Sequence, residues 1–413
     1  MGSPPDGAAA LRRRVEAEWR DNIAPFWATH APDETYGGFR GRISNDLRVD
    51  ERADKGAVLN ARILWTFSRA FAVSGDRAHR ALAERAYEYL TGHFADREHG
   101  GVYWSVDYRG RPADARKRSY AQAFALYALA EFSSAAGDRD ALGRAFDVFD
   151  LLESRCRDPL HDGYFETFER DWSLSGDQRL SEVDRDEKKS MNAHLHVLEA
   201  YAALARVSGD GRVRERLRAL VEIFLRRVLD AGATRQRMFF DEAWAPRSEV
   251  VSFGHDVEAS WLLCEAAEVL GDDEVLARVR RAALALARSV YEAGLDPRGG
   301  LYYEAIGGRV VDDEKHWWAQ AEAVVGFVNA WQLGGGGHFL SAAARVWEFV
   351  DRHLVDREHG EWFWKTSRSG APAADMPKVS EWKCPYHNGR MCFEVSRRLR
   401  GAGEGAGDGS RGG

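Results

Sequence analysis

The sequence has little cysteine and no long apolar run. Its 413 residues include four cysteines, Cys156, Cys264, Cys384 and Cys392, and none of them forms a CxxC pair. A disulfide framework is therefore excluded, and we expect reduced thiols. No segment approaches the roughly 18 uninterrupted apolar residues of a membrane span, and the first residues lack the apolar core of a signal peptide. We therefore expect a cytoplasmic enzyme with no membrane partner.

An excess of positive charge is also missing. The chain has 58 Lys and Arg against 65 Asp and Glu, a formal net charge of -7. This balance favours neither nucleic acid nor an anionic surface as a partner. The sequence also lacks a P-loop, a dinucleotide-binding glycine fingerprint and a zinc-binding HExxH motif. We therefore expect a protein that needs no cofactor and holds no metal.

Aromatic residues, in contrast, are abundant. There are 14 Trp, 13 Tyr and 20 Phe. Core packing accounts for most of them, but sugar-binding sites commonly use such a surplus, because sugar rings pack on aromatic faces. At the other extreme of composition, residues 401–413 are rich in glycine and poor in apolar residues, so we expect a disordered tail there. The remaining residues, 1–400, are predicted to form a single catalytic domain.

A turn with glycine followed by aromatic residues recurs along the chain. Copies lie near Gly37, Gly100, Gly163, Gly299 and Gly360, spaced by about sixty residues or a multiple of it. A weaker copy, RQRMFFDEAW, fills the one double-length gap. The sequence therefore contains six units.

Each unit also contains two apolar-periodic segments, separated by a short break such as SGDRA or AGDRD. Glycine at the end of one helix and aspartate at the start of the next are the expected stop and start signals. The pattern predicts an all-α protein, an (α/α)6 toroid of twelve helices with short β-hairpins at one rim. An open superhelix of the same units is the structural alternative. The predicted helices are 5–27, 57–73, 78–93, 119–136, 141–157, 190–207, 213–229, 255–270, 273–293, 315–333, 340–354 and 387–399.

Polar and aromatic residues that do not fit a core pattern recur in the first turns of the helix after each hairpin. If these helices form the inner ring, their side chains meet at one end of the central cavity. Asn192 and His196 are four residues apart, and His255 and Glu258 three, so each pair shares one helix face. We predict that the following residues form the site: Arg62, Tyr120, Asn192, His196, His255, Glu258, Trp317, Trp318, Glu322 and His387.

Each of these residues also has a purely structural interpretation. A single helical histidine is more often structural than catalytic, and Arg62 could simply pair with a carboxylate. Trp317 and Trp318 are adjacent, so they cannot both face one core. His194 and His196 point to different helix faces, so His194 is expected to face away from the site, and a metal there is not expected. Helix N-termini around the cavity would keep the site histidines neutral, the form that a general base requires.

Five stretches carry a family resemblance: KGAVLNARILWTFSRA, KKSMNAHLHVLEAY, SFGHDVEASWLL, KHWWAQAEAVVGF and EWKCPYHNGRMCFE. Over residues 13–398 the chain resembles the N-acylglucosamine 2-epimerase superfamily and, within it, the cellobiose 2-epimerases. The resemblance implies that His255 and His387 exchange the C2 proton on opposite faces of an opened aldose. It also implies that His196 polarises the O1/O2 region and that Glu258 orients His255.

The resemblance implies a set of substrate-binding positions as well. These are Arg62 and Asn192 near O1 and O2, with Tyr120 nearby, the aromatic walls Trp318 and Trp382, and the sugar-site positions Tyr303, Ser181 and Asp184. The loop LSEVDRDEKK, which shapes the sugar site in such enzymes, matches only moderately. The length of the substrate therefore stays open.

The implied reaction needs no cofactor, because the C1 aldehyde of the opened sugar acidifies the C2 proton. One imidazole removes this proton and the other delivers one to the opposite face through a cis-enediolate. The expected activity is a 2-epimerase that interconverts the reducing-end glucose and mannose of β-1,4-linked disaccharides such as cellobiose, and also lactose. The alternatives are a mannose 2-epimerase, an aldose-ketose isomerase, a glycoside hydrolase using Glu258 and Glu322, and a carbohydrate-binding scaffold without activity. The partner is a small sugar, and the chain is expected to be a monomer or a weak homodimer.

Overall fold

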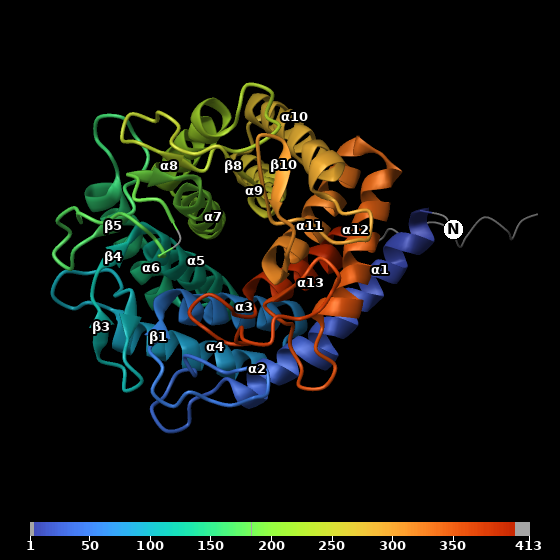
Figure 1. Cartoon of the computed structure of the whole chain (residues 1–413). Helices are drawn as coiled ribbons and strands as arrows, with labels where there is room; N and C mark the ends of the chain where they lie inside the picture. Colours follow the sequence, from blue (N-terminus) through green and yellow to red (C-terminus); the bar gives the residue numbers. More distant parts are fainter. Residues whose placement is uncertain (1–3, 183, 401–413) are drawn as a thin grey trace, which may run out of the picture.

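The helices of this protein form two concentric rings, as the computed structural model shows for residues 4–182 and 184–400 (Figure 1). The inner ring consists of α3 (Ala57–Ser74), α5 (Ser119–Ala136), α7 (Met191–Ser208), α9 (Phe253–Leu270), α11 (Trp317–Ala330) and α13 (Tyr386–Arg398). The outer ring consists of α1 (Pro4–Glu18) with α2 (Ala24–His30), α4 (Arg77–Tyr89), α6 (Arg139–Leu151), α8 (Gly211–Ile223), α10 (Asp273–Ser289) and α12 (Gly337–Phe349). None of the described helices is long and apolar enough to cross a lipid bilayer.

The ring is closed. Each inner helix packs against the next along the chain, and the last of them, α13, packs against the first, α3. At the rim, a backbone bridge between Ile43 and Val379 joins the loops of the first and last units. The predicted toroid is therefore confirmed, and the open superhelix is wrong.

Burial distinguishes the two rings. In the inner helix α5 every residue from Ser119 to Ser133 is buried, because neighbours surround it on all sides. The outer helix α10 buries a single stripe that begins Val275, Val279 and Ala282, which is the spacing of one helix face. The inner helices α3, α5, α7 and α9 each end at a glycine with positive φ, and the aspartate that follows caps the next outer helix. The four pairs are Gly75 and Asp76, Gly137 and Asp138, Gly209 and Asp210, and Gly271 and Asp272.

The outer helices differ from the prediction in one respect. Each of them carries a single π turn, such as Trp19–Ile23 between α1 and α2 or Leu90–Phe94 after α4. The other outer-ring π turns are Leu152–Cys156, Phe224–Val228, Val290–Gly294 and Val350–Leu354, and one more, Trp331–Gly335, follows α11. The predicted regular helix over 5–27 is therefore wrong in its middle. A π turn inserts one extra residue into the helix without changing the residue types, so apolar periodicity does not reveal it.

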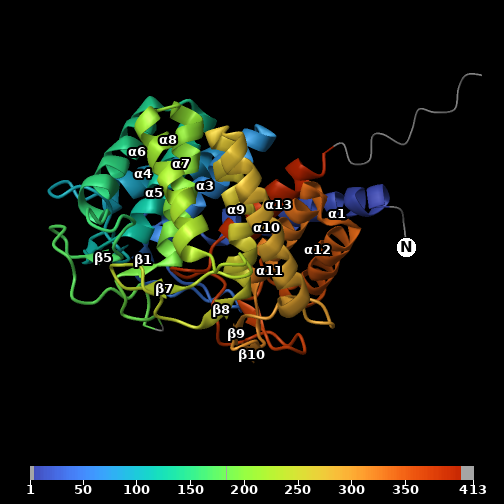
Figure 2. The ribbon, with the colours of Figure 1, turned by 90° about the horizontal axis from the view of Figure 1, so that it is seen from above.

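Short strands gather at one end of the rings (Figure 2). Most pair between neighbouring units, with β1 against β2, β4 against β5, β6 against β7, β8 against β9 and β11 against β12. The predicted hairpins at the glycine turns are each closed by an antiparallel bridge, such as that between Ala95 and Val102. The pairing of the strand before an inner helix with the next unit was not predicted. The bounds are Lys55–Gly56, Ser105–Val106, Pro112–Asp114, Lys117–Arg118, Thr167–Phe168, Lys189–Ser190, Phe239–Phe240, Val250–Ser252, Glu304–Ile306, Arg309–Asp312, Lys315–His316 and Lys365–Thr366 for β1 to β12.

Buried ion pairs fasten the glycine turns to the helices. Lys55 lies two residues before α3 and binds Asp33 of its own turn at 2.8 Å, with both side chains almost fully buried. Four more units have such a pair: Lys117 and Asp96, Lys189 and Asp158, Lys315 and Asp296, Lys378 and Asp356. The fourth unit differs, because the residue two positions before α9 is Val251 and not a lysine. The predicted tail, residues 401–413, lies outside the described residues.

Candidate active site

A cavity of about 850 Å³ opens at the rim end of the inner ring. It is lined by the first turns of the inner helices and by the rim loops. Among its lining residues are thirteen of the fourteen predicted positions: Arg62, Tyr120, Ser181, Asp184, Asn192, His196, His255, Glu258, Tyr303, Trp317, Trp318, Trp382 and His387. The inner-ring geometry thus brings together residues that are distant in the sequence.

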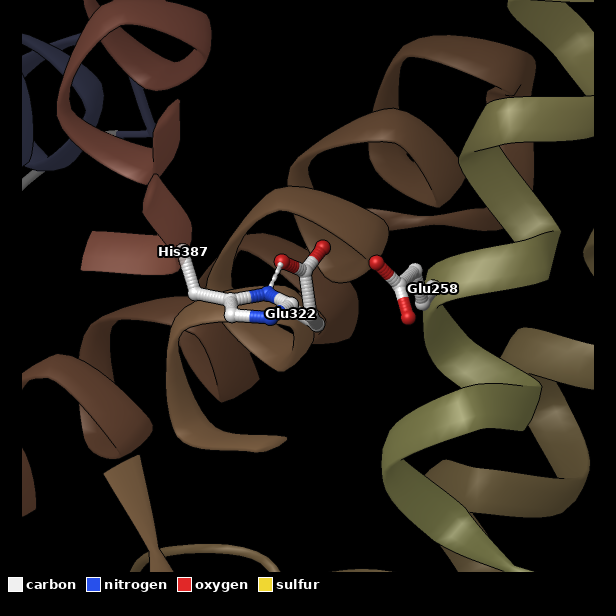
Figure 3. A group of neighbouring side chains, drawn as sticks. All are labelled: Glu258, Glu322 and His387. Carbon is white, nitrogen blue, oxygen red and sulfur yellow. Dashed lines mark hydrogen bonds and ion pairs between the residues drawn. The ribbon is translucent and has the colours of Figure 1, made fainter. Parts of the chain in front are cut away.

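Glu322 is the exception among the predicted residues. Its carboxylate lies behind His387, where Oε1 is 2.7 Å from His387 Nδ1 and Oε2 accepts a hydrogen bond from Trp261 Nε1 at 3.0 Å (Figure 3). It is 1 % exposed and does not line the cavity. The prediction that Glu322 binds substrate is therefore wrong, because the imidazole of His387 stands between it and the cavity.

The partner of His255 also differs from the prediction. His255 Nδ1 lies 2.8 Å from the hydroxyl of Ser252, one turn earlier. Glu258, which was expected to orient His255, instead accepts a hydrogen bond from Arg390 Nη2 at 2.5 Å. Glu258 lies one turn deeper in the barrel than His255, and the buried guanidinium attracts its carboxylate there.

Both histidines of the expected acid/base pair face the same indole. The ring of Trp318 lies 4.6 Å from that of His255 and 5.8 Å from that of His387, measured between centroids. His255 belongs to α9 and His387 to α13, so the two imidazoles approach from separate parts of the ring. A ligand over Trp318 would therefore meet two imidazoles.

Arg62, Tyr120 and His196 form the neighbouring wall. Arg62 Nη2 donates to the hydroxyl of Tyr120 at 2.8 Å, and its guanidinium lies 4.2 Å from the centre of the Phe124 ring. No carboxylate among the described residues forms an ion pair with Arg62, so the alternative that this residue simply pairs with a carboxylate is wrong. Asn192 lines the same wall, and its buried Oδ1 has no hydrogen-bond partner within residues 4–182 and 184–400. These polar groups can serve sugar oxygens.

Two charged residues that the sequence analysis missed hold the site together. Arg390 is 1 % exposed and binds Glu199, Glu258 and Glu322, the last at 2.6 Å. Glu199 in turn lies 3.0 Å from Nδ1 of His196. A signal was available, because Glu199 follows His196 by three residues and Arg390 follows His387 by three, the spacing that we used for His255 and Glu258.

Burial shapes the ionisation of these groups. Burial and the neighbouring His196 lower the pKa of His255 to about 3. Burial, with the charges of Arg62 and Arg390, lowers the pKa of His387 well below its ordinary value. Both imidazoles are therefore neutral at pH 7, as a general base requires. Burial and repulsion from Glu322 raise the pKa of Glu258 to about 8.

The carboxylates of Glu258 and Glu322 and the ring of His387 come close enough to suit a divalent cation (Figure 3). However, Arg390 Nη2 binds both carboxylates, at 2.5 and 2.6 Å, and thereby supplies the positive charge. A cation placed between these side chains would have to displace a buried guanidinium. The donor set therefore does not fit a metal.

His194, which was expected to face away from the site, does so. It is completely buried, does not line the cavity, and accepts a hydrogen bond from the backbone N–H of Tyr164 at 2.8 Å. Trp317 and Trp318 both reach the cavity from adjacent positions. Tyr303 stacks on His316 at 3.8 Å between ring centres, and Ser181 donates to Asp184 at 2.8 Å.

Comparisons with known proteins agree with this geometry. The family model described as N-acylglucosamine 2-epimerase matches residues 37–388. The cellobiose 2-epimerase of Bacteroides fragilis is 45% identical over 386 residues, which cover 93% of this chain and 98% of that protein. The cellobiose 2-epimerase of Ruminococcus albus is 39% identical, with 93% and 98% covered.

A comparison with solved structures also finds similarity to a cellobiose 2-epimerase. The cellobiose 2-epimerase from Bacillus thermoamylovorans superposes with a TM-score of 0.91 at 36% identity, covering 94% of this chain and all of that one. The fold, the predicted family resemblance and the sequence identity therefore agree over nearly the whole chain. The chain belongs to the N-acylglucosamine 2-epimerase family and is an isomerase.

Proposed function

We propose that this protein is a 2-epimerase that interconverts the reducing-end glucose and mannose of β-1,4-linked disaccharides, cellobiose and lactose among them. The observation that carries the proposal is the pair of neutral imidazoles, His255 and His387, which face the same indole inside the cavity. Epimerisation requires one group to take a proton from C2 and another to return one on the opposite face. Two imidazoles that come from different inner helices and face one indole support this requirement.

The reaction follows from the partners of these residues. After ring opening, one imidazole takes the C2 proton, and its electron pair moves toward C1 to give a cis-enediolate. The other imidazole, which solvent protonates for this step, gives that proton to the opposite face of C2, and the carbonyl re-forms. The first imidazole then releases its proton to solvent, so that both imidazoles are neutral again. In this proposal Arg62 is the donor that meets the negative charge developing on O1 and O2, and one well-aimed donor contributes on the order of 3 kcal/mol to such a transition state. His196, whose Nδ1 lies 3.0 Å from the Glu199 carboxylate, offers Nε2 as an acceptor for a sugar hydroxyl. No hydride or electron leaves the substrate.

The cavity also supports a second sugar. Beyond the histidines, the ring centres of Trp382 and Trp104 lie 5.6 Å apart. The guanidinium carbon of Arg118 lies 4.1 Å from the centre of the Trp104 ring. Both tryptophans and Arg118 line the cavity. Aromatic faces with a nearby charged donor suit a pyranose ring and its hydroxyls. This wall favours a disaccharide over a free aldose.

The hydrolase alternative is not supported. A glycosidase needs two carboxyl groups that flank the bond to be cleaved. Here both candidates, Glu258 and Glu322, bind the same guanidinium, and Glu322 lies outside the cavity. They are therefore not arranged around a glycosidic bond.

The test is incubation of the purified protein with cellobiose, lactose, mannobiose and free mannose in deuterium oxide. We expect a disaccharide epimer labelled at C2 and little turnover of mannose. A ketose product would show the isomerase alternative, and binding without turnover the scaffold. Either result would overturn the proposal.

A further inference from the structure

In the inner helices α5, α7, α9 and α11, the fourth residue accepts a backbone N–H from the turn of its own unit. In α5, Gln122 accepts the backbone N–H of Val102 at 2.8 Å and donates to the carbonyl of Val102 at 2.8 Å. In α11, Gln320 makes the same two bonds with Leu301, at 2.6 and 3.0 Å. We call this fourth residue the clamp. Each of these clamps offers one acceptor and one donor.

Two more inner helices use other residue types for the clamp. In α7, His194 Nε2 accepts the N–H of Tyr164, so Nδ1, 2.6 Å from the carbonyl of Ser190, carries the hydrogen. In α3, Asn60 donates to the carbonyl of Gly56 at 2.9 Å. All four of these clamps are neutral side chains, and all four donate a hydrogen bond to a backbone carbonyl.

The clamp of α9 is Asp256, and it differs from the others. Its Oδ1 accepts the N–H of Gln236 at 2.8 Å, but an ionised carboxylate has no hydrogen to donate. Asp256 is 2 % exposed, and the adjacent Oε1 of Gln236 is buried with no partner in the described part of the chain. In this unit the position that holds a buried lysine in most others is Val251. The cation that acts on Asp256, Arg235, has a half-exposed side chain and pairs with Asp230 at 4.0 Å.

We infer that Asp256 is held as a neutral carboxylic acid whose O–H supplies the missing donor, and that it is a positioning residue for His255. The link is Gln236, which Asp256 holds and whose Nε2 donates to the backbone carbonyl of His255 at 2.8 Å. Asp256 does not line the cavity. The role in positioning rests on the proposed function, whereas the neutral state of the side chain does not.

The surroundings of Asp256 agree with this state. Burial and the charge of Asp230 raise the pKa of Asp256, while the hydrogen bonds from Gln236 and the charge of Arg235 lower it, and the net result is a pKa of about 7. On its own helix, the neighbouring ionisable groups are His255 and Glu258. Because the pKa in the folded state lies above that in the unfolded chain, ionisation of this group lowers the stability as the pH rises from about 4 to about 7.

The first experiment is thermal unfolding of the wild type and of Asp256→Asn between pH 5 and pH 8. Asparagine keeps one acceptor and one donor but does not ionise. We expect the difference in melting temperature, variant minus wild type, to increase by several degrees as the pH rises from 5 to 8. Gln122→Glu is the matched control, because it places an ionisable clamp on α5 and should lose stability as the pH rises. Parallel curves for the wild type and Asp256→Asn would overturn the inference.

The second experiment follows kcat and KM on cellobiose from pH 6 to pH 9. As the pH rises, the kcat of the wild type should begin to fall at a lower pH than the kcat of Asp256→Asn. The KM should change less than about twofold, because the residue lies outside the cavity. Asp256→Ala, which lacks both groups, should lose about tenfold in kcat at every pH. If the melting curves differ but the kcat profiles coincide, the positioning role is wrong. If no sugar is turned over, the proposed function fails while the melting curves still decide the state of Asp256.

Discussion

The two sides of the cavity support their imidazoles differently. On the α9 side, Nδ1 of His255 meets the hydroxyl of Ser252 at 2.8 Å, a neutral group. On the α13 side, Nδ1 of His387 meets the carboxylate of Glu322 at 2.7 Å, and this carboxylate is held by Arg390 and Trp261. His387 is 5 % exposed, whereas His255 is only partly buried.

In the proposed reaction, this difference gives the two imidazoles unequal support as bases. A carboxylate that accepts the Nδ1 hydrogen fixes the tautomer with Nε2 free toward the cavity and stabilises the imidazolium that forms. A hydroxyl can either donate or accept, so it does not impose a tautomer. We therefore expect His387 to depend strongly on its partner and His255 to depend weakly on its own.

Removal of either imidazole should have the largest effect. Because each proton transfer needs its own group, His387→Ala and His255→Ala should each lose on the order of 10³-fold or more in kcat for epimerisation. Product analysis by chromatography checks this, with circular dichroism as the control for folding. Retention of a tenth of the activity by one variant would remove that histidine from the pair.

Loss of the buried guanidinium of Arg390 should have the second-largest effect. Arg390→Met leaves Glu199, Glu258 and Glu322 without their shared cation, and removal of one partner of a buried charge cluster costs about 3–5 kcal/mol of unfolding free energy. Urea unfolding measures this quantity. A control is Arg397→Met on the same helix, whose half-exposed side chain should contribute less than about 1 kcal/mol. Equal losses in the two variants would argue against the central role of Arg390.

The comparison of the two sides is tested most directly through the partners. Glu322→Gln should lower kcat about 100-fold, because the amide no longer fixes the tautomer of His387, while KM should change little since Glu322 lies outside the cavity. Ser252→Ala should lower kcat only a few-fold. Both variants are measured under the same conditions with cellobiose. A larger loss in Ser252→Ala than in Glu322→Gln would reverse the comparison.

The smallest effect concerns stability in acid. Since the folded pKa of His255 is about 3, below that of the unfolded chain, this residue resists protonation when folded. Its contribution to stability is present above about pH 6.5 and is lost as the pH falls toward 3. When the pH is lowered from 7 to 5, the melting temperature of His255→Gln should therefore fall less than that of the wild type. Indistinguishable slopes would contradict the burial effect on this group.

Much of the architecture could be predicted from the repeats. The glycine turns and apolar periods gave six units, and the polar residues at helix starts located nearly the whole cavity wall. The π turns could not be predicted, because they change hydrogen bonding without changing composition. Nor could the partner of Glu258, since the choice between His255 and Arg390 depends on how far α13 reaches into the barrel. Glu322 was misplaced because sequence spacing gives the helix face but not the depth along the axis.

Closure between α13 and α3 has a consequence for how the enzyme is made. Of the two proposed acid/base residues, His255 lies on the fourth inner helix and His387 on the last, which follows the bridge of Val379 at the rim. Because a domain folds as a unit, the ring can close only when the last inner helix has been synthesised. In the proposed mechanism, a chain that ends before α13 lacks one of the two imidazoles and cannot epimerise a sugar, whatever helices it has formed.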